Sequence, residues 1–270
     1  MTVLIVLLGL GLSHVLYPLV RRRNFLWFNR LMLHVQQGWS GRPWYPAAAV
    51  LIIVLLLSWL ASTLATAWAG TFGWFLLALA TFIYTLGPRD LDRDVKALLA
   101  GGNEPRHLKA RRVMRIQRTA DAPTAAAGIF HAAQARWFGV VFWFVVLGIP
   151  GALLYRLTRL SLHLPDWSED QAHWLLKLRF VLDWPVLVLM LISAGLGGDL
   201  DAVRQAWRNH GAGGSRWLIR DQVLDGVAAL TVASDATFEE GVEAGHHMVW
   251  RMLLIWLVVL SLLLIAGWLS

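Results

Sequence analysis

The chain has 270 residues, of which 57% are hydrophobic and 15% are charged, against roughly 25% charged residues in an ordinary soluble domain. Its net charge of +7 comes from 24 basic and 17 acidic residues, and it contains no cysteine. The absence of cysteine excludes disulfides, thiolate zinc sites and thiol catalysis. Sixteen tryptophans, many of them where an apolar run meets polar sequence, are typical of the aromatic belts of membrane proteins.

Apolar segments predict an all-α fold, namely a polytopic helical membrane bundle that forms a single domain over residues 1–270. The segments are 3–20, 47–68, 71–86, 137–157, 180–197 and 249–269. About 20 apolar residues cross the ~30 Å hydrocarbon core as a helix. If the first segment only lies at the membrane surface, the number of crossings falls from six to five. The connections 88–136 and 199–248 are expected to form short helical cytoplasmic loops.

Basic residues predict the orientation of these segments, because short cytoplasmic loops accumulate Lys and Arg. Three consecutive arginines at 21–23 directly follow the first segment, which places the amino terminus outside. Residues 21–46 contain five basic residues and no acidic one, and residues 87–136 contain ten basic and five acidic residues. Residues 156–179 contain four basic and three acidic residues, and residues 199–248 contain four basic and eight acidic residues. The first four segments therefore fit an arrangement with both termini outside and three loops inside. The last two loops decide less, because their basic totals are equal.

The positive charge is expected to face anionic membrane lipids rather than nucleic acid, because no nucleic-acid recognition motif accompanies it. The stretch 106–118 predicts a helix lying on the inner membrane surface. Its basic face is expected to carry Leu108, Arg111, Arg112, Arg115 and Arg118, with Val113, Met114 and Ile116 elsewhere on the helix.

The fourth segment contains a break in an otherwise uninterrupted apolar run. Pro150 removes one backbone donor, and Gly148 and Gly151 permit close approach of a neighbouring helix. We therefore expect a kinked membrane helix. The same glycines would also serve contacts between chains, so a homo-oligomer is compatible with the sequence.

A short motif occurs after the third and the fifth segments, as Leu-Gly-Pro-Arg-Asp-Leu-Asp at 86–92 and as Leu-Gly-Gly-Asp-Leu-Asp at 196–201. One interpretation is capping, in which each glycine ends a helix and the first aspartate begins the next. The other is a site at the inner membrane face that holds Mg²⁺ and a phosphorylated ligand. Its candidate ligand-binding residues are Arg89, Asp90, Asp92, Arg93, Asp199 and Asp201, with Arg136 and Arg156 as further contacts.

Other polar residues near the apolar segments allow two interpretations as well. Glu243 lies three residues before His246 and four before His247, ahead of the last segment, and the three are weak metal candidates, although a solvated helix entry is the favoured interpretation. Asp183 lies within the fifth segment, and an outer-interface helix entry beside Trp184 is preferred over a buried site. No catalytic residue set, phosphate-binding loop or nucleophile elbow is present.

The chain resembles the AmpE family, inner-membrane proteins linked to β-lactamase induction. The matching residues are Ala135–Phe138, Phe142–Phe144, Leu147–Gly148, Pro150–Arg156, Leu182–Pro185, Leu86–Gly87 with Arg89–Leu91, and Ala206–Arg208. The resemblance implies a non-catalytic regulatory protein that acts through cytosolic or membrane partners in peptidoglycan recycling, without a cofactor.

The Pro150–Arg156 segment also makes the chain distantly similar to the CobD/CbiB membrane enzymes, which join an aminopropanol phosphate to a corrinoid carboxylate. After Arg156, however, the chain reads Leu-Thr-Arg-Leu where those enzymes carry Asn-Thr-Leu-Asp. Two functions therefore remain open: a regulatory membrane protein without catalytic activity, or an enzyme or binder that uses Mg²⁺ and a phosphorylated ligand.

Overall fold

In a computed structural model of the chain, the described secondary structure is entirely helical, which confirms the all-α class. The structure describes residues 1–15, 25–38, 45–87, 90–102, 104–164, 167–198, 200–210 and 219–267. The helices are α1 (Thr2–Val15), α3 (Leu26–Gly38), α4 (Tyr45–Thr85), α5 (Leu91–Leu99), α6 (Pro105–Met114), α7 (Ala122–Ala133), the π-helix η1 (Gln134–Phe138), α8 (Gly139–Ser161), α9 (Glu169–Gly197), α10 (Leu200–His210), α11 (Ile219–Leu230) and α12 (Phe238–Ile265).

The described residues contain four helical stretches that are long and apolar enough to cross a membrane. They are Ala47–Thr85, Ala122–Ser161, Glu169–Gly197 and Phe238–Ile265. The expected five or six crossings are not confirmed. The apolar part of the first segment is only Thr2–Ser13, and the second and third segments both lie in α4. The four stretches indicate a membrane protein.

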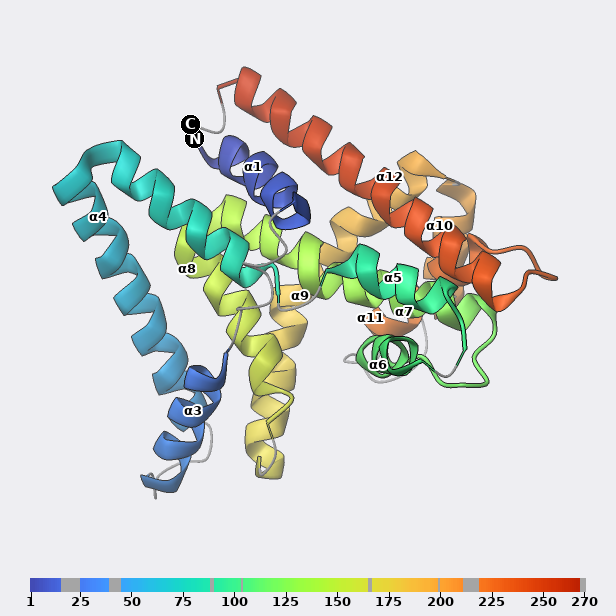
Figure 1. The fold of residues 1–270 in the computed structure, drawn as a ribbon, viewed down its shortest axis with the longest axis horizontal. Coiled ribbons are helices and arrows are strands. Elements are labelled where there is room, and N and C mark those ends of the chain that lie inside the picture. The colour runs from blue at the N-terminus through green and yellow to red at the C-terminus, as the bar shows by residue number, and fades with distance from the viewer. Residues whose placement is uncertain are drawn as a thin grey trace. The chain divides into compact units, whose positions relative to one another are not determined.

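Helix α4 bends sharply in the middle, and its two arms are clearly separate in Figure 1. Ala69 has φ −127° and ψ 16°, and Gly70 has φ 60° and ψ −153°. The Gly70 conformation is essentially restricted to glycine. The bend therefore falls where the sequence separates two apolar segments.

Helix α8 contains the predicted break. Gly148 has φ 66° and ψ −146°, so the helix is interrupted two residues before Pro150. A Cβ atom at Gly151 would overlap the carbonyl oxygen of Trp143. Glycine is thus required at 148 for its backbone conformation and at 151 for close approach of the chain to itself.

The chain divides into two compact units, which we describe separately. The first comprises Met1–Pro88, Gly139–Asp183 and Leu264–Ser270, and the second comprises Arg89–Phe138 and Trp184–Leu263. In the first unit α4 packs against α1, α3 and α8. Phe82 of α4 lies 4.8 Å from the ring of Phe144 and directly against Gly9 of α1, so aromatic side chains fill the spaces that small residues leave.

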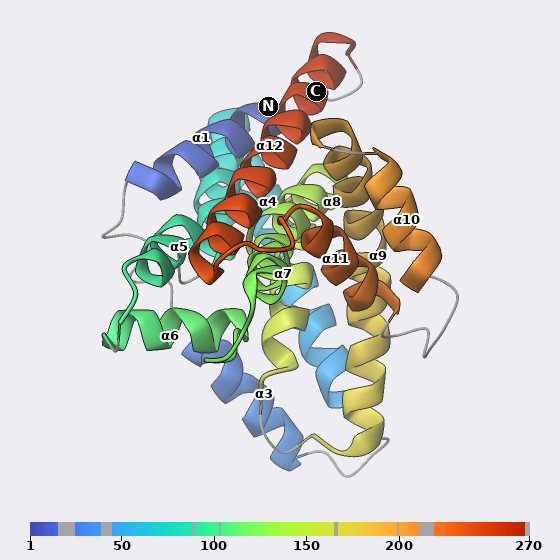
Figure 2. The same ribbon diagram turned by 90° about the vertical axis from the view of Figure 1, so that its right-hand side faces the viewer.

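In the second unit α7 is the central helix, with α5, α6 and α11 packed around it (Figure 2). Nearly all residues of α7 are buried, because its alanines and Gly128 allow neighbours to approach closely. On α12, Gly241 lies against the backbone of Ala122 and Gly245 against that of Ala126. The second contact lies four residues further along both helices than the first, so α7 and the start of α12 run in the same direction.

Candidate functional site

Helix α5 places two carboxylates inside the second unit. Asp90 caps the helix, accepting a hydrogen bond from the backbone N–H of Asp92 at 3.1 Å. Leu91, Val95 and Leu98 form a buried apolar face, and their burial places the first turn of α5 in the interior of the unit. The side chains of Asp92 and Asp94 are consequently only 8% and 2% exposed.

Asp92 binds two side chains of α12. Its Oδ1 lies 2.7 Å from Nε2 of His246 and accepts a hydrogen bond from Nε1 of Trp250 at 3.1 Å. The Nε1 of Trp250 also lies 3.1 Å from Nε2 of His246. A carboxylate only accepts, so Nε2 of His246 must carry a hydrogen to bind it. The indole N–H is then directed to Asp92, and the protonation state of His246 is decided at its other nitrogen, Nδ1.

Asp94 binds a different helix. Its Oδ2 accepts a hydrogen bond from Nη1 of Arg136 at 2.8 Å, and the two side chains are 2% and 9% exposed. Arg136 lies in η1, a single π-helical turn between α7 and α8. Turns of this kind are rare and are frequent at functional sites, because the extra residue redirects the side chains that follow.

The same π-helical turn brings Trp137 to α12, where its ring lies 5.4 Å from that of Trp250 in an edge-to-face arrangement. We name Asp92, Asp94, Arg136, His246 and Trp250 the α5 cluster. It joins α5, η1 and α12 through buried charged hydrogen bonds, which are stronger than neutral ones at low dielectric.

The other predicted ligand-binding residues are spread over the chain. Arg89 and Asp199 lie outside the described residues. Arg93 is exposed on α5, and Asp201 is exposed in the first turn of α10. In the part of the chain that the structure describes, no three His, Asp or Glu side chains are close enough to hold a metal ion. The predicted magnesium site therefore gains no support.

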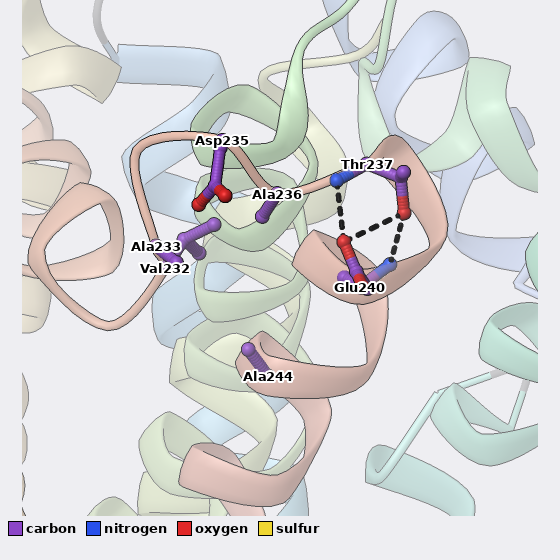
Figure 3. Close-up of a pocket in the computed structure, with 7 residues that line it drawn as sticks. All are labelled: Val232, Ala233, Asp235, Ala236, Thr237, Glu240 and Ala244. Atoms are coloured by element: carbon purple, nitrogen blue, oxygen red, sulfur yellow. Dashed lines mark hydrogen bonds between the residues drawn. The ribbon is translucent and has the colours of Figure 1, made fainter.

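The acidic start of α12 serves in part as a helix cap, as Figure 3 shows. The carboxylate of Glu240 accepts hydrogen bonds from the backbone N–H and the hydroxyl of Thr237 at 2.6 and 3.0 Å, and the Glu240 N–H binds the same hydroxyl at 3.3 Å. This is a reciprocal capping box. Glu243 and His247 are exposed, while His246 points to Asp92.

An open hollow of about 420 Å³ lies beside this cap. Its lining residues are Val232, Ala233, Asp235, Ala236, Thr237, Glu240 and Ala244 (Figure 3). Four of them are apolar and small, and the carboxylate of Glu240 is engaged by Thr237. The hollow therefore offers few polar groups that converge on one point, unlike a typical ligand pocket.

Asp183 corrects the sequence-based preference for an interfacial helix entry. It lies in the middle of α9 and is completely buried. Its Oδ2 accepts hydrogen bonds from Nη1 of Arg159 at 3.2 Å and from Nε of Arg179 at 3.1 Å. The preference was wrong because α9 begins eleven residues before the apolar segment, at Glu169. We name Asp183, Arg159 and Arg179 the α9 triad.

Arg156 is buried in the first unit and is part of neither cluster. Its guanidinium lies 5.6 Å from the ring of Phe25 and directly over Gly87, at which a Cβ would overlap its Nη2. Gly87 has φ 108°, so glycine is needed there for the backbone as well. The Arg156 side chain thus packs against the end of α4.

Helix α6 differs from the predicted surface helix in its orientation. Arg111 turns inward, where its guanidinium donates to His107 and to the carbonyl of Gln117 and lies over the ring of Phe238. Met114 and Ile116 are buried. The exposed basic side chains are Arg106, Lys109, Arg112, Arg115 and Arg118. The prediction that Arg111 belongs to the exposed basic face was therefore wrong.

Comparisons of the chain with protein families, with curated proteins and with solved structures give no match. The α5 cluster and the α9 triad thus rest on geometry alone. Neither group was recognised from the sequence, because the members that pair between helices are separated by 24 to 158 positions. The local signals were spacings of four residues, between Arg179 and Asp183 and between His246 and Trp250.

Proposed function

We propose that the protein is a bacterial inner-membrane regulator that acts through partner proteins in peptidoglycan recycling and β-lactamase induction. The proposal rests on the resemblance to the AmpE family and on the four helical stretches that can cross a membrane. Under it, the two helical regions between spans contact cytosolic or membrane partners, and no catalytic step or cofactor is needed.

The observation that carries the proposal is the engagement of Asp92 and Asp94 within the protein. The magnesium–phosphate site expected from the sequence would use the carboxylate of Asp92 as an oxygen ligand. Asp92 instead receives hydrogen bonds from α12, and Asp94 receives one from η1. Separating Asp92 or Asp94 from its partner would leave an unpaired buried charge, which would lower the stability of the fold by several kcal/mol. The arrangement favours a role in holding helices together over a role in binding a ligand.

The direction of the helices supports the orientation that we propose. Since α7 and the start of α12 run the same way, the connections before them begin from the same side of the membrane. The connection before α7, residues 86–121, carries nine of the basic residues, which is typical of a cytoplasmic loop. A periplasmic amino terminus follows if residues 3–20 cross and the two arms of α4 each cross.

The test is deletion of the gene, followed by complementation with the wild-type chain and with Asp92→Asn. Loss of normal β-lactamase induction and altered muropeptide pools on deletion, both restored by the wild-type chain, are expected. Unchanged induction and unchanged pools would contradict the proposal. Native mass spectrometry of the purified protein addresses the enzyme alternative: a phosphorylated molecule that stays bound to the wild type and disappears in Asp92→Asn would replace the regulatory proposal.

A further inference from the structure

The two acids of α5 are held by partners of different chemistry. Asp94 binds Arg136, whose guanidinium stays protonated at every physiological pH. Asp92 binds His246, and imidazole is the side chain whose ordinary titration lies in the physiological range. One end of the α5 first turn is thus tied to η1 by a permanent ion pair. The other end is tied to α12 by the hydrogen bond between Asp92 and the imidazole of His246.

We propose that the α5 cluster is a proton-responsive latch, in which Asp92 and His246 close α5 onto α12 while Asp94 and Arg136 anchor α5 to η1. When His246 is protonated, an imidazolium faces a carboxylate that is 8% exposed. When it loses the proton at Nδ1, the hydrogen bond from Nε2 remains but the ion pair does not. Asp92 is a carboxylate in both states, so they differ by the Coulomb attraction between the imidazolium and Asp92, which is stronger where the pair is shielded from water. The latch is therefore tighter at lower pH.

The surroundings of His246 allow this response. Its side chain is 21% exposed, so protons reach it, whereas Asp92 is shielded. On α12, Glu243 lies one turn earlier and His247 has its ring 6.4 Å away, both exposed to solvent. On α5 the charged neighbours are Arg93, which is exposed, and Asp94. On η1 the guanidinium of Arg136 is directed to Asp94. The carboxylate in direct contact with His246 is thus Asp92.

Movement of α5 has a consequence for its surroundings. Helix α5 packs on α6 and α7, and it lies in the connection between two candidate spans, Ala47–Thr85 and Ala122–Ser161. Release from α12 with the Asp94 anchor intact would rotate α5 about η1 and shift α6, which displays the exposed basic residues. The latch goes beyond the proposed function and does not depend on it.

The experiment uses the absence of cysteine from the sequence. Nitroxide labels are placed on the full-length protein at Lys96→Cys of α5 and Glu239→Cys of α12, both of which are exposed positions. Pulsed electron paramagnetic resonance then measures the distance distribution in detergent at about pH 6 and about pH 8, on either side of the ordinary histidine titration. We expect the closed distance to lose at least about two-fold of its population at the higher pH.

Two variants decide the interpretation. His246→Gln keeps a donor but cannot change charge, so its distribution is expected to be the same at both pH values, and Asp92→Asn is expected to behave likewise. His131→Gln is the matched control, because His131 of α7 forms a solvent-accessible pair with Asp225 of α11 at 2.7 Å. It should retain the wild-type response. A wild-type distribution that does not change with pH, or a response that persists in His246→Gln, would overturn the latch.

Discussion

The two buried carboxylate sites differ in what surrounds them. Asp183 in the first unit is completely buried and receives two arginines, so its partners remain charged at every physiological pH. Asp92 in the second unit receives a histidine and a tryptophan, one titratable and one neutral. Both sites pair a buried carboxylate with hydrogen-bond donors. At Asp92 the strength of the interaction depends on whether the histidine is protonated, whereas at Asp183 both partners keep their charge. The first unit therefore holds a fixed contact and the second an adjustable one.

The largest effect is expected from removing the carboxylate of the α9 triad. Asp183→Ala leaves Arg159 and Arg179, which are only 14% and 16% exposed, without their shared acceptor. Loss of one partner from a buried ion pair typically costs about 3–5 kcal/mol. The free energy of unfolding, measured in detergent micelles, should fall by about this amount at both pH 6 and pH 8.

Asp183→Asn is the matched control, because it keeps the size of the side chain and one acceptor oxygen. It should recover part of the loss. If Asp183→Ala is as stable as the wild type, the α9 triad contributes no net stability and the comparison of the two sites fails.

The helical class and the breaks were predictable, because both depend on local sequence. Apolar length predicts helices in a membrane, and the proline with two flanking glycines predicts the interruption of α8 at Gly148. The number of crossings was not confirmed, because apolar length alone does not show whether the two arms of α4, which meet at Gly70, cross the membrane separately.

The partners of buried charges were not predictable, because they come from helices distant in sequence. Asp92 and His246 were both singled out, but as members of two different metal-site hypotheses, and the structure joins them to each other. Asp90 was correctly interpreted as a helix cap, since capping involves only neighbouring residues.

A smaller effect is expected from the second donor to Asp92. Trp250→Phe keeps the aromatic contact with Trp137 but removes the hydrogen bond to the carboxylate. A hydrogen bond to a charged group contributes about 1.5–3 kcal/mol to stability. The free energy of unfolding should fall within this range.

Trp256→Phe provides the comparison within the same helix. The Nε1 of Trp256 donates to the hydroxyl of Ser193 at 3.0 Å, which is a neutral hydrogen bond. Its loss should cost about 0.5–1.5 kcal/mol. If Trp250→Phe and Trp256→Phe lose the same free energy of unfolding, the hydrogen bond to the Asp92 carboxylate is no stronger than the one to the Ser193 hydroxyl. That result would contradict a special role for the charge of Asp92.

The smallest effect is expected at an exposed carboxylate, which shows what burial adds. Asp121 caps α7, and hydrogen bonds from the side chain and backbone of Thr124 hold the pKa of its carboxyl below the ordinary value. A lowered pKa means that the stabilisation is complete above the unfolded-state pKa and is lost as the pH falls through the folded-state pKa. Asp121→Ala should cost about 1 kcal/mol at neutral pH and almost nothing in strong acid, in unfolding titrations over that range.

Asp121→Ser, which can still cap the helix, should retain most of the stability without this dependence on pH. A loss at neutral pH as large as that of Asp183→Ala would mean that burial is not what distinguishes these carboxylates.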